Sequence, residues 1–288
     1  MKFGAYFAYW EKEWDADYMR YCQKFADIGF DVLEVSGAGL YEMNEQQLIA
    51  LKDEAARCGV KLTGCIGFSK ACDVSSEDPE VRAAGIAYAK RLFDHMHIAG
   101  IDRLSGIIYS YWPFDYTQKF SKPVMRANAL ESVRILADYA AQYDILMNLE
   151  VVNRFEHPLL NTAAEAVAFA KDVDRPNVKI LLDTFHMNIE EDNIPAAIRL
   201  TGDYLGHIHV GEANRKLPGQ GSLDWRAIAA AVHDVHYDGN VVMEPFLLKG
   251  GSVGKDIKVW RDLSNGADEA KMDQMLADAV KFLHANFD

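Results

Sequence analysis

Basic residues are scarce in this sequence. The chain contains 30 Lys plus Arg against 43 Asp plus Glu, which gives a formal net charge of −13 at pH 7. A chain this acidic repels phosphate backbones and anionic lipid headgroups, so the balance argues against nucleic-acid binding and against a membrane-surface role. We therefore expect neither nucleic acid nor membrane among its partners.

Cysteine and long apolar runs are also scarce. The four cysteines, Cys22, Cys58, Cys65 and Cys72, show no CxxC spacing. They are typical of reduced cytosolic thiols and predict a cytoplasmic protein. No apolar run approaches the length of a membrane-spanning helix. The N-terminal apolar stretch, residues 4–10, is too short and too aromatic for a secretory signal, and a buried first strand explains it better.

Linkers, low-complexity tracts and solenoid repeats are absent, which predicts a single domain over residues 1–288. That length suits one α/β barrel. No Gly-rich phosphate turn follows the first apolar run, where YFAYWEKEW stands instead, and this disfavours an open doubly wound sheet. A lone GxG at 219–221 predicts only a turn. We therefore expect no nucleotide cofactor.

Short β-rich apolar runs alternate with amphipathic segments along the whole chain. The runs predict eight strands near 2–7, 30–35, 60–66, 104–109, 144–151, 177–183, 205–210 and 240–246. Helices are expected between them, among others at 44–58, 80–99, 126–142, 162–173 and 225–235, with a last helix at 268–286. Strands alternating with helices indicate parallel pairing, and eight parallel strands close into a ring. The sequence predicts an α/β fold, a (β/α)₈ barrel.

Four possible metal ligands stand at or near the ends of the last four predicted strands. They are Glu150, Asp183, His209 and Glu244, separated by 33, 26 and 35 residues, so each falls one strand–helix unit after the last. Residues two apart share a strand face, and this alternation places the polar ends together inside the barrel. Active sites of such barrels lie at the C-terminal ends of the strands.

Three carboxylates confined in one cavity repel each other, and a divalent cation removes that penalty. Three oxygen donors and one imidazole favour Mn²⁺, Mg²⁺ or Co²⁺ over a thiolate-type zinc site. His207, two residues before His209, is interpreted as a hydrogen-bonded core residue or one that supports the ligands. The constellation predicts one divalent metal ion per chain.

Longer motifs surround these ligands. They are YFAYWEKEW, YSYWPFDY, LEVVNRFE, LDTFHMNIEED, HIHVGEANR, MEPF and GGSVGKDIKVWRDLSNGA. They resemble the D-tagatose 3-epimerase and D-psicose (D-allulose) 3-epimerase family, and because they are distributed from residue 6 to residue 267, the resemblance extends over nearly the whole chain. The resemblance implies a (β/α)₈ barrel with bound Mn²⁺ or Co²⁺, an isomerase that interconverts ketohexose C3 epimers (D-fructose/D-psicose and D-tagatose/D-sorbose), and a homodimer or homotetramer.

The resemblance also implies roles for individual residues. The metal ligands would be Glu150, Asp183, His209 and Glu244, and the catalytic pair would be Glu150 and Glu244. The residues that hold the O1–O2 end of the ketose would be Glu156, His186 and Arg215. The remaining pocket residues would be Tyr6, Cys65 and Trp112. Without the family, a surface salt bridge would explain Arg215, a helix cap would explain His186, and pairing with Arg154 would explain Glu156.

The chemistry of C3 inversion suits two carboxylates. The C3 proton of a 2-ketose lies next to the C2 carbonyl, so its removal gives an enediolate, which a cation stabilises. Inversion then requires a proton acceptor on one face and a donor on the other. Glu150 and Glu244 would supply that pair. A single base would return the proton to the same face or move it to a neighbouring carbon.

Other functions share parts of this pattern. A metal-dependent aldose–ketose or hydroxypyruvate-type isomerase would use the same ligands with a different proton path. A barrel endonuclease resembling the abasic-site family would need more histidines and a basic groove, which this sequence lacks. A non-catalytic sugar-binding barrel would have little reason to keep two opposed carboxylates on one metal. The chain also departs from the family at Ser222, Leu223 and Asp224, which leaves substrate preference and the subunit interface open.

Overall fold

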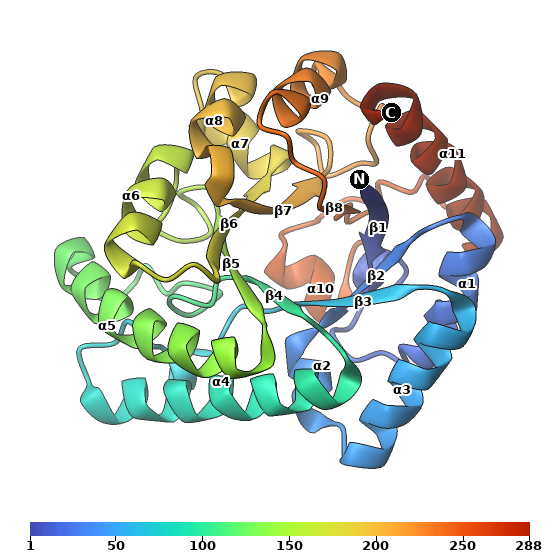
Figure 1. The fold of residues 1–288 in the computed structure, drawn as a ribbon. Coiled ribbons are helices and arrows are strands. Elements are labelled where there is room, and N and C mark those ends of the chain that lie inside the picture. Colours follow the sequence, from blue (N-terminus) through green and yellow to red (C-terminus); the bar gives the residue numbers. More distant parts are fainter.

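The computed structural model describes residues 1–288 and contains eight parallel strands. They are β1 (Lys2–Tyr6), β2 (Val32–Ser36), β3 (Lys61–Cys65), β4 (Arg103–Gly106), β5 (Leu146–Val151), β6 (Val178–Asp183), β7 (Leu205–Val210) and β8 (Asn240–Met243). Each strand pairs with the next along the chain, and β1 pairs with β8, so the sheet closes into a barrel (Figure 1). The predicted (β/α)₈ fold is confirmed.

Most of the helices surround the barrel as an outer ring, and the short α10 is drawn inside that ring (Figure 1). The α-helices are α1 (Met19–Ile28), α2 (Gly37–Glu42), α3 (Glu45–Cys58), α4 (Pro79–Ala99), α5 (Lys122–Ala140), α6 (Ala163–Val173), α7 (Thr184–Glu190), α8 (Ile194–Thr201), α9 (Trp225–Asp234), α10 (Gly251–Asp256) and α11 (Glu269–Phe287). Short 3₁₀ turns are η1 (Phe7–Tyr9), η2 (Lys70–Cys72), η3 (Ala141–Tyr143) and η4 (Gly202–Tyr204). Helix α11 lies between α9 and α1 and completes the ring (Figure 1).

Local sequence signals set several helix ends. The Asn44 side chain accepts a hydrogen bond from the Gln47 backbone, and Gln47 returns one to the Asn44 backbone, so α3 begins with a capping box. Helices α1, α3 and α4 end at Gly29, Gly59 and Gly100, whose φ angles are 97°, 71° and 69°. Glycine adopts this left-handed conformation without a Cβ penalty, and each of these helices therefore turns directly into the next strand.

Two strands end three residues earlier than the apolar runs predict. Strand β4 ends at Gly106, whose φ of 114° turns the chain, and an added Cβ there would lie 2.2 Å from the Ile66 carbonyl oxygen. Strand β8 ends at Met243, and Pro245, which has no N–H, follows soon after. Glu244 therefore lies just beyond its strand, although its N–H still donates to the Val210 carbonyl.

Two short helices form where the sequence pattern predicts none. SGAGLYEM after β2 forms α2, and LLKGGSVG after β8 includes the start of α10. Both helices are only six residues long, too short for the apolar periodicity that reveals a helix in a sequence. The GxG at 219–221 forms a turn, as predicted. No helix is both long enough and apolar enough to cross a lipid bilayer.

Candidate active site

The four predicted ligands meet at the C-terminal end of the barrel. Glu150 lies near the end of β5, Asp183 ends β6, His209 lies near the end of β7, and Glu244 follows β8. One ligand atom from each residue lies within 4.8 Å of the others. All four side chains are buried or nearly so. Positions spread over nearly a hundred residues thus form one cluster because parallel strands end at the same rim.

The donor geometry of this cluster fits a divalent cation. His209 Nδ1 is buried without a hydrogen-bond partner. It lies 3.9 Å from Glu150 Oε1 and 3.7 Å from Glu244 Oε1. A buried nitrogen left unpaired among carboxylates is costly for the fold, and coordination to a cation satisfies it. Three carboxylates and one imidazole form a mainly hard donor set, which suits a divalent ion.

The electrostatics of the cluster indicate excess negative charge. Burial and the nearby Glu244 raise the pKa of Glu150 well above its ordinary value. Burial raises the pKa of Asp183 to about 6, although the Arg215 guanidinium opposes that shift. A bound divalent cation would offset both the cost of burying these carboxylates and their mutual repulsion.

Arg215 is the principal cation near these carboxylates. Its Nη1 lies 3.3 Å from Asp183 Oδ2 and 3.2 Å from Glu244 Oε2. The guanidinium carbon also lies 3.8 Å from the centroid of the Phe185 ring. The side chain is buried, which excludes the surface salt bridge that would otherwise explain this residue. Arg215 therefore neutralises part of the charge of the acidic cluster, and its remaining guanidinium N–H groups are available to the cavity.

His186, in α7, presents a hydrogen-bond donor to the site. Its Nδ1 accepts the backbone N–H of Asn153 at 3.2 Å, so the ring proton resides on Nε2. Nε2 lies 3.5 Å from Asp183 Oδ2 and 3.8 Å from Glu150 Oε1. Burial and the nearby Arg215 hold the pKa of His186 well below its ordinary value. The imidazole is therefore a neutral donor aimed into the cluster.

Glu156 contacts both Arg215, beside the acidic cluster, and the aromatic side chain of Trp112. Its Oε2 accepts the Trp112 indole N–H at 2.7 Å, and its Oε1 lies 3.7 Å from Arg215 Nη2. The alternative pairing of Glu156 with Arg154 is wrong, because the exposed Arg154 side chain pairs with Glu190 at 2.8 Å instead. Glu156 thus holds both a pocket aromatic and the main cation of the site.

A cavity of about 290 Å³ opens beside the cluster, a volume at the lower end of the range for small-molecule sites. The predicted site residues among its lining side chains are Tyr6, Cys65, Trp112, Glu150, Glu156, His186, Arg215 and Glu244. Sequence reasoning missed other lining residues, among them Trp14, Ile66, Phe246 and Ile257. Burial raises the pKa of the Cys65 thiol well above its ordinary value, so that side chain is neutral.

The segment that departs from the family, residues 222–224, lies outside this cavity. The Leu223 N–H donates to the buried carboxylate of Glu212 at 3.3 Å. Asp224 caps α9 by accepting the N–H of Ala227 at 3.1 Å. These residues therefore shape the loop and the start of a helix, and they do not contact the space where a substrate would lie.

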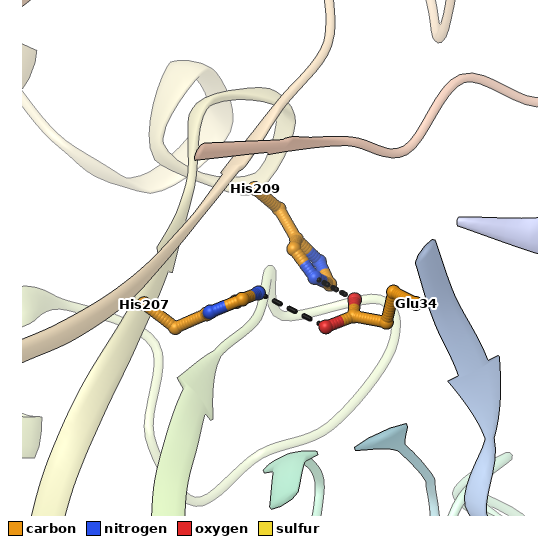
Figure 2. Close-up of side chains that lie close together, drawn as sticks. All are labelled: Glu34, His207 and His209. Atoms are coloured by element: carbon orange, nitrogen blue, oxygen red, sulfur yellow. Dashed lines mark hydrogen bonds and ion pairs between the residues drawn. The ribbon is translucent and has the colours of Figure 1, made fainter. Parts of the chain in front are cut away.

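Glu34 is a buried acid in contact with a predicted ligand, and sequence reasoning missed it. It lies in the middle of β2 with no solvent exposure, and its Oε1 accepts His209 Nε2–H at 2.6 Å (Figure 2). His207 Nε2 lies 3.0 Å from the other oxygen. Burial acts to raise the pKa of Glu34, but the two histidines outweigh it and hold that pKa well below its ordinary value. The available signal was an acid placed between apolar residues, Leu33 and Val35, inside a predicted strand.

The chain is similar to known epimerases over nearly its whole length. It is 48% identical to a D-psicose 3-epimerase of Agrobacterium fabrum over 98% of each chain. A crystal structure of D-psicose 3-epimerase in the presence of D-fructose superposes with a TM-score of 0.99 at 47% identity, covering 100% of this chain and 99% of that one. The D-psicose 3-epimerase of Clostridium cellulolyticum H10, solved with D-tagatose, gives 0.99 at 46% identity over 100% of both chains.

Residues 22–263 match the family described as a xylose isomerase-like TIM barrel. The resemblance drawn from the motifs is thus confirmed by the fold and by the identity of its relatives. The chain belongs to the D-psicose 3-epimerase family of carbohydrate epimerases, within the xylose isomerase-like TIM barrels.

Proposed function

We propose that this protein interconverts the C3 epimers of free ketohexoses, D-fructose with D-psicose and D-tagatose with D-sorbose. One observation carries the proposal: the carboxylates of Glu150 and Glu244 approach the same nitrogen, His209 Nδ1, from two strand ends that are not neighbours in the barrel. A sugar bound between them would have one carboxyl group on each face of C3.

This arrangement supplies the two proton transfers that inversion requires. One carboxylate takes the C3 proton, and the electron pair left behind forms an enediolate with the C2 carbonyl. The opposite carboxyl group then delivers a proton to the other face of C3. The two glutamates exchange roles when the reaction runs in reverse, so one site serves both epimers.

Other residues of the cavity would orient the ketose. The neutral His186 offers Nε2–H and Arg215 offers guanidinium N–H groups, so both suit the hydroxyl and carbonyl oxygens at the O1–O2 end. Glu156 would accept a sugar hydroxyl while it holds Trp112 in place. The rings of Trp112 and Tyr6 present flat apolar surfaces for sugar C–H groups.

Glu150, Asp183, His209 and Glu244 would together hold one divalent cation. When bound, the cation supplies positive charge that stabilises the enediolate oxygens. The oxygen-rich ligand set favours Mn²⁺ or Co²⁺, with Mg²⁺ as a further candidate. Metal analysis of the purified protein by mass spectrometry identifies the ion.

The reaction is tested directly with D-fructose and Mn²⁺ in D₂O. We expect D-psicose to appear by chromatography and to carry deuterium at C3, because a carboxyl group that exchanges with solvent delivers the new proton. Heat-inactivated protein is the control. Deuterium found only at C1, with an aldose as product, would instead identify an aldose–ketose isomerase.

A second prediction is that free sugars are substrates and sugar phosphates are not. The cavity lining carries four carboxylates, those of Glu150, Glu156, Glu244 and Asp256, against Arg215, and it includes no lysine. A phosphate dianion therefore gains little there. Lys216 and Lys249, the nearest loop candidates in the sequence, are not among the lining residues.

We expect millimolar D-psicose or D-fructose to compete with each other for turnover, whereas D-fructose 6-phosphate does not inhibit. A kcat/KM for a ketose phosphate tenfold above that of its free sugar would contradict the prediction.

Three further expectations stay predictions. The whole chain is expected to act as one catalytic domain, in the cytoplasm, as a homodimer or homotetramer. Large exposed aromatic side chains, Phe155 at 67% and Trp260 at 73%, are available for contacts between copies. Light scattering on the purified protein measures the assembly.

A further inference from the structure

Glu34 occupies an unusual place for a charged residue. It lies in the middle of β2 between Leu33 and Val35, and none of the three is exposed to solvent. Its side chain reaches across the barrel to β7, which is separated from β2 by β8 and β1. A buried carboxylate is costly unless it is paired, so the contacts that compensate it indicate its purpose.

Both oxygens of Glu34 are used. Oε1 accepts the Nε2–H of His209 at 2.6 Å, the shorter of its contacts to histidine, and Oε2 accepts the Thr63 hydroxyl at 2.8 Å. His207 Nε2 also lies 3.0 Å from Oε2. Figure 2 shows the two carboxylate oxygens, each facing one of the two imidazole rings. Glu34 therefore joins a predicted metal ligand to a histidine that is not one.

The bond from His209 fixes how that ligand faces the cluster. Because the proton resides on Nε2, Nδ1 has a free lone pair, and this is the nitrogen that lies near Glu150 and Glu244. It has no hydrogen-bond partner in the protein. A carboxylate behind a ligating imidazole fixes the ring orientation and raises the basicity of the ligating nitrogen.

We infer that Glu34 is a positioning residue of the metal centre, which holds His209 with Nδ1 directed at the ion and thereby sets the affinity for the metal. The inference rests on the proposed function, because it requires that the cluster binds a divalent cation. The alternative, a second ion held by Glu34, His207 and His209, would need the His209 nitrogen that Glu34 already occupies.

Two substitutions of Glu34 separate the effect of its charge from the effect of its side-chain length. Glu34→Gln keeps the shape and removes the charge, and Glu34→Asp keeps the charge and shortens the side chain. We expect each to raise the Kd for Mn²⁺, measured by calorimetry on chelator-treated protein, by about 10- to 100-fold, the usual effect of losing such a partner. The matched control, Thr63→Val, removes the other hydrogen bond to Glu34 and should change the Kd far less.

A measurement on the unaltered protein does not depend on how the variants fold. In ¹⁵N spectra of the Mg²⁺-loaded chain, His209 should carry its proton on Nε2, and a proton on Nδ1 would overturn the inference. Variants with wild-type Kd and altered thermal stability alone would also overturn it, as would two Mn²⁺ ions per wild-type chain. If the wild-type chain binds no divalent ion, the proposed function fails together with the inference.

Discussion

Glutamine at position 150 or 244 should lower the rate of D-fructose epimerisation by at least about 10²-fold, the usual size of a general acid–base contribution. Glutamine retains an oxygen that can bind the ion, but it neither accepts nor delivers the C3 proton. Turnover is measured by chromatography with Mn²⁺ in excess, and metal content is measured on the same samples. Full metal occupancy with lost turnover assigns the defect to proton transfer.

A partial reaction distinguishes the two glutamates. A chain with only one working carboxyl group should still exchange the C3 hydrogen of one epimer with solvent while it fails to invert that carbon. We expect Glu150→Gln and Glu244→Gln to exchange opposite epimers in D₂O, followed by proton NMR. Exchange of the same epimer by both variants, or wild-type turnover in either, would contradict the two-carboxylate arrangement.

Removal of the metal should abolish turnover and lower the melting temperature. Without the ion, Glu150, Asp183 and Glu244 repel one another, and Arg215 and His209 offset only part of that repulsion. Free metal at 100 times its Kd stabilises a folded protein by about 2.7 kcal/mol. For a chain of this size that corresponds to a change in Tm of roughly 5 °C. Differential scanning calorimetry with and without Mn²⁺ measures it.

The matched control for this experiment is Asp183→Asn. It removes one of the crowded charges, so the metal-free protein is relieved of repulsion and Mn²⁺ should raise its Tm less than it raises that of the wild type. Mn²⁺ or Co²⁺ should restore both activity and Tm to the wild-type protein after chelation. Full activity after exhaustive dialysis against chelator, with no metal detected by mass spectrometry, would refute the dependence.

The barrel fold was predictable because the same sequence pattern, a β-rich run followed by an amphipathic segment, repeats along the chain. Each of the eight strands overlaps one of the eight β-rich runs in the sequence, and the glycines that end α1, α3 and α4 mark the turns between helix and strand. The metal ligands were predicted from the same strand pattern. Parallel strands end at one rim of the barrel, and each of the four acidic or histidine residues stood at or near a predicted strand end. Short elements such as α2 and α10 were not predictable, because six residues carry too little periodicity.

Contacts between side chains on opposite sides of the barrel could not be predicted from the sequence. Glu34 and His209 are 175 positions apart on strands that do not pair, so no local pattern relates them. The same holds for Trp14, which reaches the cavity from the loop after β1. Pairing of Arg154 with Glu190, which leaves Glu156 free for Trp112, likewise depended on how α7 packs against the loop after β5.

The sequence by itself determined the strand count, the fold class, the family and the identity of the cluster that would hold the metal, because these depend on periodicity, on residue type and on motifs read along the chain. Only the tertiary structure decided which nitrogen of His209 faces the cluster, which side chains neutralise it and which residues line the cavity. Those features arise from distances between residues on different strands, and closure of the barrel sets them.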